Sequence, residues 1–122
     1  ICNHFQGVSM QKHCWHENIA VAITVTNSEG TIIEMNQKAA DTFSKSGGKT
    51  LIGKNILDCH PPKAQEKIKQ LSQNKQTNVY TVEKKGVKKL IYQTPYFEHG
   101  EYAGLVEFSF EIPEQLPHFI RE

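Results

Sequence analysis

Cysteine and histidine residues near the N-terminus form the first group whose chemistry stands out. They form two Cys-x-His pairs, each with one residue between its members: Cys2 with His4, and Cys14 with His16. Four such side chains can complete a tetrahedral zinc site, but structural zinc favours ligands two to four residues apart. The other interpretation is an amphipathic helix after an irregular chain end. The pattern therefore predicts no metal here, with zinc as the alternative.

A second pair, Cys59-His60, stands just before Pro61 and Pro62. Imidazole and thiolate groups can each ligate iron or zinc. The structural alternative is that His60 packs against the start of a helix that the prolines begin, with Cys59 as a small buried hydrophobe. Catalysis is not expected from this pair, because a nucleophile and its base must converge in space.

The sequence also lacks the short motifs of common enzyme classes. It contains no glycine-rich phosphate loop, no nucleophile elbow and no His-Glu-x-x-His. We therefore predict that this chain is not an enzyme, and that its function lies in binding or signalling.

Length, charge and cysteine content narrow the class of protein further. The 122 residues predict one domain, and 14 Lys+Arg against 13 Asp+Glu weigh against direct contact with nucleic acid. No apolar run reaches the roughly 20 residues that cross a bilayer, so no membrane contact is expected. Three irregularly spaced cysteines predict reduced thiols and a cytoplasmic location. Because the sequence begins with Ile1, we expect it to be a piece of a longer protein with further domains.

Hydrophobic periodicity predicts the elements that position these residues. Helices are expected at Ser9–Asn18, after a cap at Asn36, and from Pro61 to about Asn74. Strands are expected over residues 20–26, 31–35, 77–83, 88–97 and 101–112. A lysine-rich turn around Gly86 should be an exposed hairpin, and Pro95 indicates an edge or a bulge. This order predicts an α+β layout, an antiparallel sheet with helices on one face.

Several short motifs, in this order and spacing, resemble a PAS domain. The run at 30–40 (GTIIEMNQKAA) resembles the family's G-x-I-x-x-x-N-x-A-A stretch, and Ile52-Gly53-Lys54 resembles its L-I-G-K step. The string DCHP at 58–61 resembles a shortened D-x-x-H-P region, and GEYAG at 100–104 resembles the turn before the last strand. The resemblance implies the PAS fold, a five-stranded antiparallel sheet with helices on one face.

The resemblance also sets expected boundaries. An N-terminal helical extension would occupy residues 1–18, the PAS domain 19–113 and a C-terminal tail 114–122. The string from Cys59 to Pro62 is similar to a bacterial subgroup joined to hemerythrin-like or uncharacterised domains. Where PAS domains often end in Asp-Ile-Thr, this chain has Glu111-Ile112-Pro113, which puts coupling to a following helix in doubt.

What the resemblance implies about function is a sensory module. It would bind a small molecule or cofactor between sheet and helices, and signal to another domain or a homodimer partner, with Trp15 and the first helix at the dimer contact. By position, the pocket candidates are Ile23, Ile33, Phe43, Ile56, Cys59, His60, Ile68, Leu71, Tyr92, Val106 and Phe108. One alternative is a ligand-free dimerisation domain with a packed core. Another is a haem-based gas or redox sensor with His60 as axial ligand. The identity of any cofactor stays open.

Overall fold

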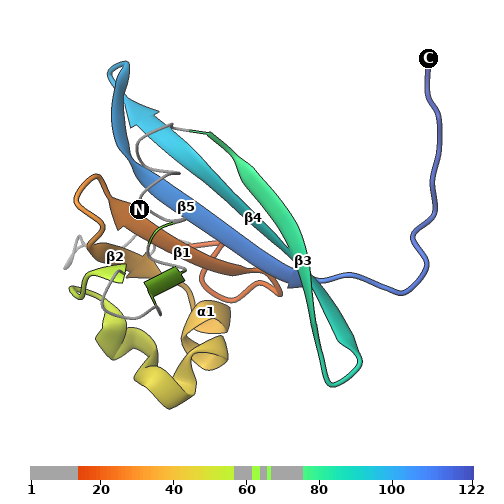
Figure 1. Cartoon of the computed structure of the whole chain (residues 1–122), viewed down its shortest axis with the longest axis horizontal. Coiled ribbons are helices and arrows are strands. Elements are labelled where there is room, and N and C mark those ends of the chain that lie inside the picture. The colour runs from red at the N-terminus through yellow and green to blue at the C-terminus, as the bar shows by residue number, and fades with distance from the viewer. Residues whose placement is uncertain (1–13, 57–61, 64–65, 67–75) are drawn as a thin grey trace.

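A computed structural model describes residues 14–56, 62–63, 66 and 76–122. These residues form a five-stranded antiparallel sheet in the order β2-β1-β5-β4-β3 (Figure 1). The strands are β1 (Ala22–Asn27), β2 (Ile32–Met35), β3 (Asn78–Lys84), β4 (Val87–Glu98) and β5 (Glu101–Glu111). The helical pieces are α1 (Gln37–Thr42) and two 3-10 helices, η1 (Ser44–Ser46) and η2 (Gly48–Leu51). The α+β architecture expected from the sequence is confirmed.

The first hairpin is closed by an asparagine and a glycine. The Asn27 side-chain oxygen accepts hydrogen bonds from the backbone N–H groups of Glu29 (2.9 Å) and Thr31 (3.0 Å). Gly30 has a φ of 84°, a conformation that a side chain at this position would strain. The turn therefore returns the chain as β2 antiparallel to β1, as the sequence predicts.

Asn36 joins three parts of the chain at the beginning of α1. Its Oδ1 accepts hydrogen bonds from the N–H groups of Ala39 (3.0 Å) and Ile23 (2.9 Å). It therefore caps the helix and connects the beginning of the helix to β1. Its Nδ2 donates to the carbonyls of His16 (2.7 Å) and Val21 (2.8 Å). The side chain is buried, with 2 % of its surface exposed, and all these bonds compensate its desolvation.

β5 passes so close to β1 that only glycine fits at one position. A Cβ on Gly104 would stand 1.9 Å from the backbone oxygen of Thr26. The same glycine is paired with Asn27 on β1 and with Tyr96 on β4. Gly104 therefore permits the central register of the sheet.

The hydrophobic core lies between the sheet and the helical pieces. Its buried cluster draws on β1, β2, α1, η2 and the segment after η2, and consists of Ala22, Ile32, Met35, Ala39, Leu51 and Ile56. Burial of this apolar surface holds the helical pieces against the β1–β2 side of the sheet (Figure 1).

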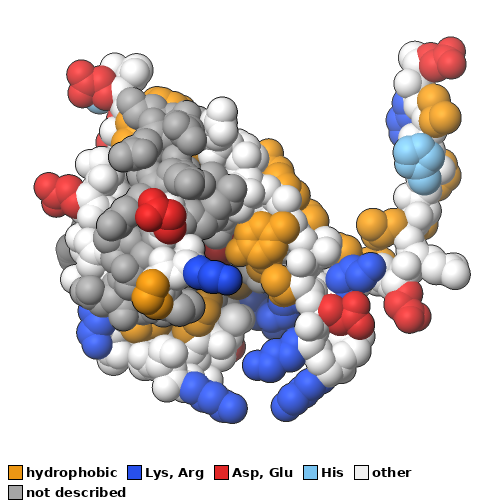
Figure 2. Space-filling model, in the orientation of Figure 1, with side chains coloured by type: hydrophobic (Ala, Val, Ile, Leu, Met, Phe, Trp, Pro, Cys, Tyr) orange, Lys and Arg blue, Asp and Glu red, His pale blue; other side chains and the backbone are white. Residues whose placement is uncertain are grey.

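Pro95, the lysine-rich turn and the C-terminal tail lie in the outer parts of the fold. Pro95 pairs with Leu105 beyond the end of β3, next to a register shift at Tyr96/Phe97, as the edge-or-bulge prediction requires. The lysine-rich turn between β3 and β4 is exposed, with positive φ at Lys85 and Gly86. The tail after Pro113 extends away from the sheet and stands clear of the body (Figures 1 and 2).

The predicted helix at Ser9–Asn18 lies partly outside the described residues. Its described part, 14–18, forms a turn in which the Glu17 N–H donates to the Cys14 carbonyl (2.9 Å). Cys14 is disulfide-bonded, so the expectation of three reduced thiols is wrong. Of the helix expected after Pro61, Pro62, Lys63 and Glu66 are helical and the other positions lie outside the described residues. No helix in the described part of the chain is long and apolar enough to cross a membrane.

Candidate functional site: a cavity between the sheet and the helices

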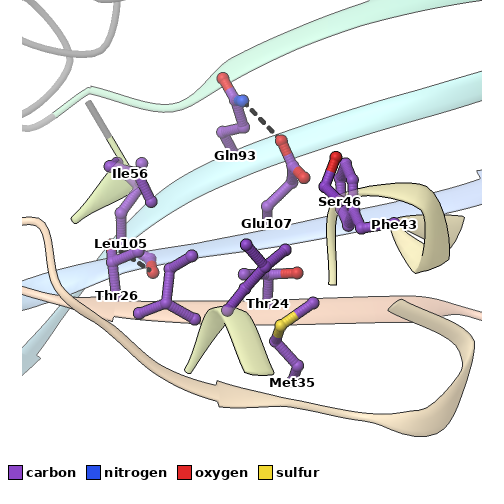
Figure 3. Close-up of a pocket in the computed structure, with 11 residues that line it drawn as sticks. Thr24, Thr26, Met35, Phe43, Ser46, Ile56, Gln93, Leu105 and Glu107 are labelled. Carbon is purple, nitrogen blue, oxygen red and sulfur yellow. Dashed lines mark hydrogen bonds between the residues drawn. The ribbon is translucent and has the colours of Figure 1, made fainter. Parts of the chain in front are cut away.

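A cavity of about 110 Å³ lies between the sheet and the helical pieces (Figure 3). Its wall combines the helix-facing side of β1, β2, β4 and β5 with η1, η2 and their flanks. The residues that line it are Thr24, Thr26, Ile32, Met35, Phe43, Ser46, Leu51, Ile56, Gln93, Leu105 and Glu107.

The register of the sheet explains why these strand residues face the cavity together. Side chains directly opposite each other on paired strands point to the same face, and successive residues alternate between faces. Glu107 on β5 lies opposite Thr24 on β1 and opposite Gln93 on β4. A row of three polar side chains therefore crosses the middle of the sheet inside the cavity.

This polar row is ordered by hydrogen bonds across three strands. Gln93 Nε2 donates to Glu107 Oε2 (2.7 Å; Figure 3), and Asn78 Nδ2 on β3 donates to Gln93 Oε1 (3.0 Å). Burial, and then the negative charge of Glu107, raise the pKa of Tyr80 above its usual value of 10.0. The cavity thus has a negative, hydrogen-bonding end at β4 and β5.

The other end of the cavity is apolar. Ile32, Met35, Leu51 and Ile56 line it and are buried in the core cluster. A site with one polar end and one apolar end is typical of small-molecule pockets, in which apolar surface provides affinity and a few polar groups fix orientation.

Two of the predicted pocket residues line this cavity, namely Phe43 and Ile56. The row Ile23, Phe108 and Tyr92 crosses β1, β5 and β4 on the opposite face of the sheet. Val106 shares that face, opposite Val25, and Ile33 is 43 % exposed. Val79 on β3 is paired with Tyr92 and continues the row of Ile23, Phe108 and Tyr92. We call the side of the sheet that carries this row the outer face. The structure therefore separates these five predicted residues from the cavity.

Sequence reasoning missed the polar wall of the cavity because it assigned the most hydrophobic residues to the interior. Thr24 and Glu107 each stand between two apolar residues, and Gln93 follows Tyr92, so the alternation was visible in the first two of these strands. The signal that could have found them is the recurrence of polar residues at matching positions in three strands that the fold aligns.

The remaining predicted ligands fall partly outside the described residues. Cys59, His60, Ile68 and Leu71 lie there, so the haem alternative with His60 stays a prediction. Cys2 and His4 also lie outside. Cys14 is disulfide-bonded and offers no thiolate, while His16 Nε2 lies 3.9 Å from Glu34 Oε2. Within the described ranges, no cluster of three metal-ligating side chains occurs.

A family model of the PAS domain matches residues 20–112. Because this match spans most of the sequence, the chain belongs to the PAS domain family. That membership places it in a class of sensory and signalling modules. Among curated proteins, no match is found.

Solved structures share the fold at low sequence identity. The PAS domain of histidine kinase ThkA is 20 % identical with a TM-score of 0.62, over 75 % of this chain and 99 % of that one. The PAS domain of BvgS from Bordetella pertussis is 21 % identical with a TM-score of 0.61, over 81 % and 82 %. VqmA bound to DPO is 10 % identical with a TM-score of 0.61, over 79 % of this chain and 54 % of that one.

Proposed function

We propose that this chain is a sensor module that binds a small molecule in the cavity between its sheet and helices. The observation that carries the proposal is the row of Thr24, Glu107 and Gln93 in a cavity whose other lining residues, apart from Thr26 and Ser46, are apolar. These three side chains are half-buried, so they keep polar groups at the cavity wall where a fully packed core would favour apolar side chains. The likeness to VqmA bound to DPO supports the proposal, since that protein of similar fold was solved with a bound molecule.

The signal would travel through the strands that carry the polar row. Gln93 and Glu107 link β4 to β5, and Asn78 extends the link to β3. A ligand that binds the Glu107 carboxylate beside the Gln93 amide would change this contact between the two longest strands. β5 then leads directly to Pro113 and the tail, so a shift of β5 would reach whatever follows this domain.

The outer face supports a second proposed role, contact with another copy of the chain. Its apolar row is partly open to water, with Tyr92 39 % exposed and Val79 49 % exposed. Trp15, 71 % exposed, lies next to His16, which approaches Glu34 on β2. Covering such apolar surface is favourable, so we propose homodimer formation through this face.

Occupation of the cavity can be tested by native mass spectrometry and by thermal unfolding with a panel of small molecules. Ser46→Phe would place a ring at the cavity wall, while Ser44→Phe changes an exposed residue of the same 3-10 helix that does not line the cavity. We expect a retained mass or a thermal shift in the wild type and in Ser44→Phe, and its loss in Ser46→Phe. Absence of binding throughout the panel would contradict the proposal and favour the interaction role.

A further inference from the structure

Glu107 occupies a central position in the wall of the cavity. It stands on β5, the middle strand of the sheet, with Thr24 on one side and Gln93 on the other. An ionised carboxylate offers about four lone-pair positions on its two oxygens. The Gln93 amide bonds to Oε2. No donor among the described residues bonds to the other oxygen, Oε1, which can therefore accept from a molecule that enters the cavity.

The orientation of Gln93 makes this end of the cavity an acceptor site. Its Oε1 receives the Asn78 amide, so its Nε2 is directed at Glu107. Among the described residues, no lysine, arginine or histidine forms a salt bridge with Glu107. Burial, and then the negative charge of Glu107, raise the pKa of Tyr80. The hydroxyl groups of Thr24 and Ser46 add two further acceptors to the lining.

The size of the cavity restricts what can reach that carboxylate. Its volume is about 110 Å³, somewhat below the roughly 150 Å³ of an apolar cavity that binds benzene. A molecule of about five non-hydrogen atoms, one fewer than benzene, therefore fits. The apolar side chains of Met35, Leu51 and Ile56 would surround its body, leaving one end against the acceptors.

We propose that the cavity selects small alkylammonium ligands, with the Glu107 carboxylate as counter-ion and hydrogen-bond acceptor. This inference rests on the proposed function, because it names the ligand class of the same cavity. An ammonium head carries three donors and a positive charge, which match the acceptors at this end. A branched alkyl body of three or four carbons matches the apolar end. Anionic ligands of the same shape would be repelled.

Three probes of nearly equal shape test the charge preference, namely isobutylammonium, isobutanol and isobutyrate. Calorimetric titration of the protein should give the ammonium probe an affinity at least about tenfold above that of the alcohol, because charge-assisted hydrogen bonds are about twice as strong as neutral ones. Isobutyrate should bind more weakly than the alcohol. In Glu107→Gln, the ammonium preference over the alcohol should fall to about twofold or less.

Glu111→Gln is the matched control. It removes the same charge four residues further along β5, at an exposed position opposite Lys89 that does not line the cavity. It should keep the ammonium preference. A cavity that binds the three probes equally, or prefers isobutyrate, overturns the ligand class while leaving the sensor role intact. Binding of none of them, together with an empty result from the wider panel, overturns both proposals.

Discussion

The two faces of the sheet differ in the side chains that cross their centres. The cavity face carries threonine, glutamine and glutamate at its centre, ordered by hydrogen bonds from β3 to β5. The outer face carries a row of aliphatic and aromatic side chains, Ile23, Phe108, Tyr92 and Val79, without such a polar centre. The comparison shows that a polar row and buried apolar side chains such as Met35 and Leu105 share the covered face of this sheet, so an apolar strand residue does not by itself identify which face is covered. The covered face lines the cavity for which we propose a ligand, and the outer face carries the partly exposed apolar row for which we propose contact with another copy of the chain.

Both faces depend on the close pairing of β1 and β5, so disrupting that pairing has the largest effect we expect. Gly104→Val would place its Cβ against the Thr26 backbone oxygen, which no side-chain movement can relieve. We expect a loss of more than about 4 kcal/mol in the free energy of unfolding, measured in urea. As a control, Gly100→Ala meets no atom within 4 Å and should cost about 1 kcal/mol through its positive φ alone. Equal stability of the two variants would contradict this account of the register.

Asn36 tests how the helical cover is attached to the cavity face. Asn36→Ala leaves the N–H groups of Ile23 and Ala39 without their side-chain acceptor, so we expect a loss of about 2–4 kcal/mol in unfolding free energy. Asn36→Asp keeps the acceptor and loses the donors to the His16 and Val21 carbonyls. Its free energy of unfolding should lie between those of the wild type and Asn36→Ala. Chemical denaturation distinguishes them. An aspartate variant as unstable as the alanine variant would mean that the helix cap contributes little.

A pair of neighbouring substitutions on β4 separates the functions of the faces. Tyr92→Glu puts a charge on the outer face, and should weaken self-association at least about tenfold in sedimentation equilibrium while preserving ligand binding. Gln93→Leu alters the cavity face and should do the reverse, weakening ligand binding with the dimer intact. If both variants change the same property, the division between the faces is wrong.

Two tyrosines, one on each face, give the smallest and most local test. Burial, and then Glu107, raise the pKa of Tyr80, whereas burial, and then Glu98, raise that of Tyr96 on the outer face. A raised folded-state pKa means that the stability contributed by the neutral tyrosine is present below pH 10.0 and is lost as the pH rises through the folded-state pKa.

Tyrosinate absorbance during an alkaline titration measures these two ionisations. Glu107→Gln should lower the pKa of Tyr80 toward its usual value and leave that of Tyr96 in place. Tyr80→Phe identifies which ionisation is which. A change at Tyr96 alone in Glu107→Gln would show that the carboxylate does not act on the cavity face.

Much of the fold was predictable because its signals are local. The Asn27–Gly30 turn and the Asn36 cap are specified by residues within a few positions, and the cap appears where the sequence analysis expects it. The strands also follow from the alternation of apolar and polar residues, a signal that can be read within each segment by itself. Local patterns therefore yielded the elements, their order and the layer arrangement.

The face that lines the cavity was less accessible, because it depends on which side of the sheet the helices cover. On β5, Leu105 and Phe108 are both apolar yet point to opposite faces, so alternation alone leaves the choice open. The pairing of Thr24, Glu107 and Gln93 places them on one face, and the helical pieces that pack against that face make it the wall of the cavity. The disulfide of Cys14 was likewise hidden, since irregular cysteine spacing carries no pairing information.

The most direct test of this account is an amide-resolved NMR titration of the wild-type protein with isobutylammonium. We expect saturable shifts at the cavity-face residues of β1, β4 and β5, with contacts from the probe's methyl groups to Met35 and Leu105. The outer-face row of Ile23, Phe108 and Tyr92 should move far less. Saturable shifts centred on that outer row, with the cavity face unchanged, would contradict the assignment of the ligand site to the polar face of the sheet.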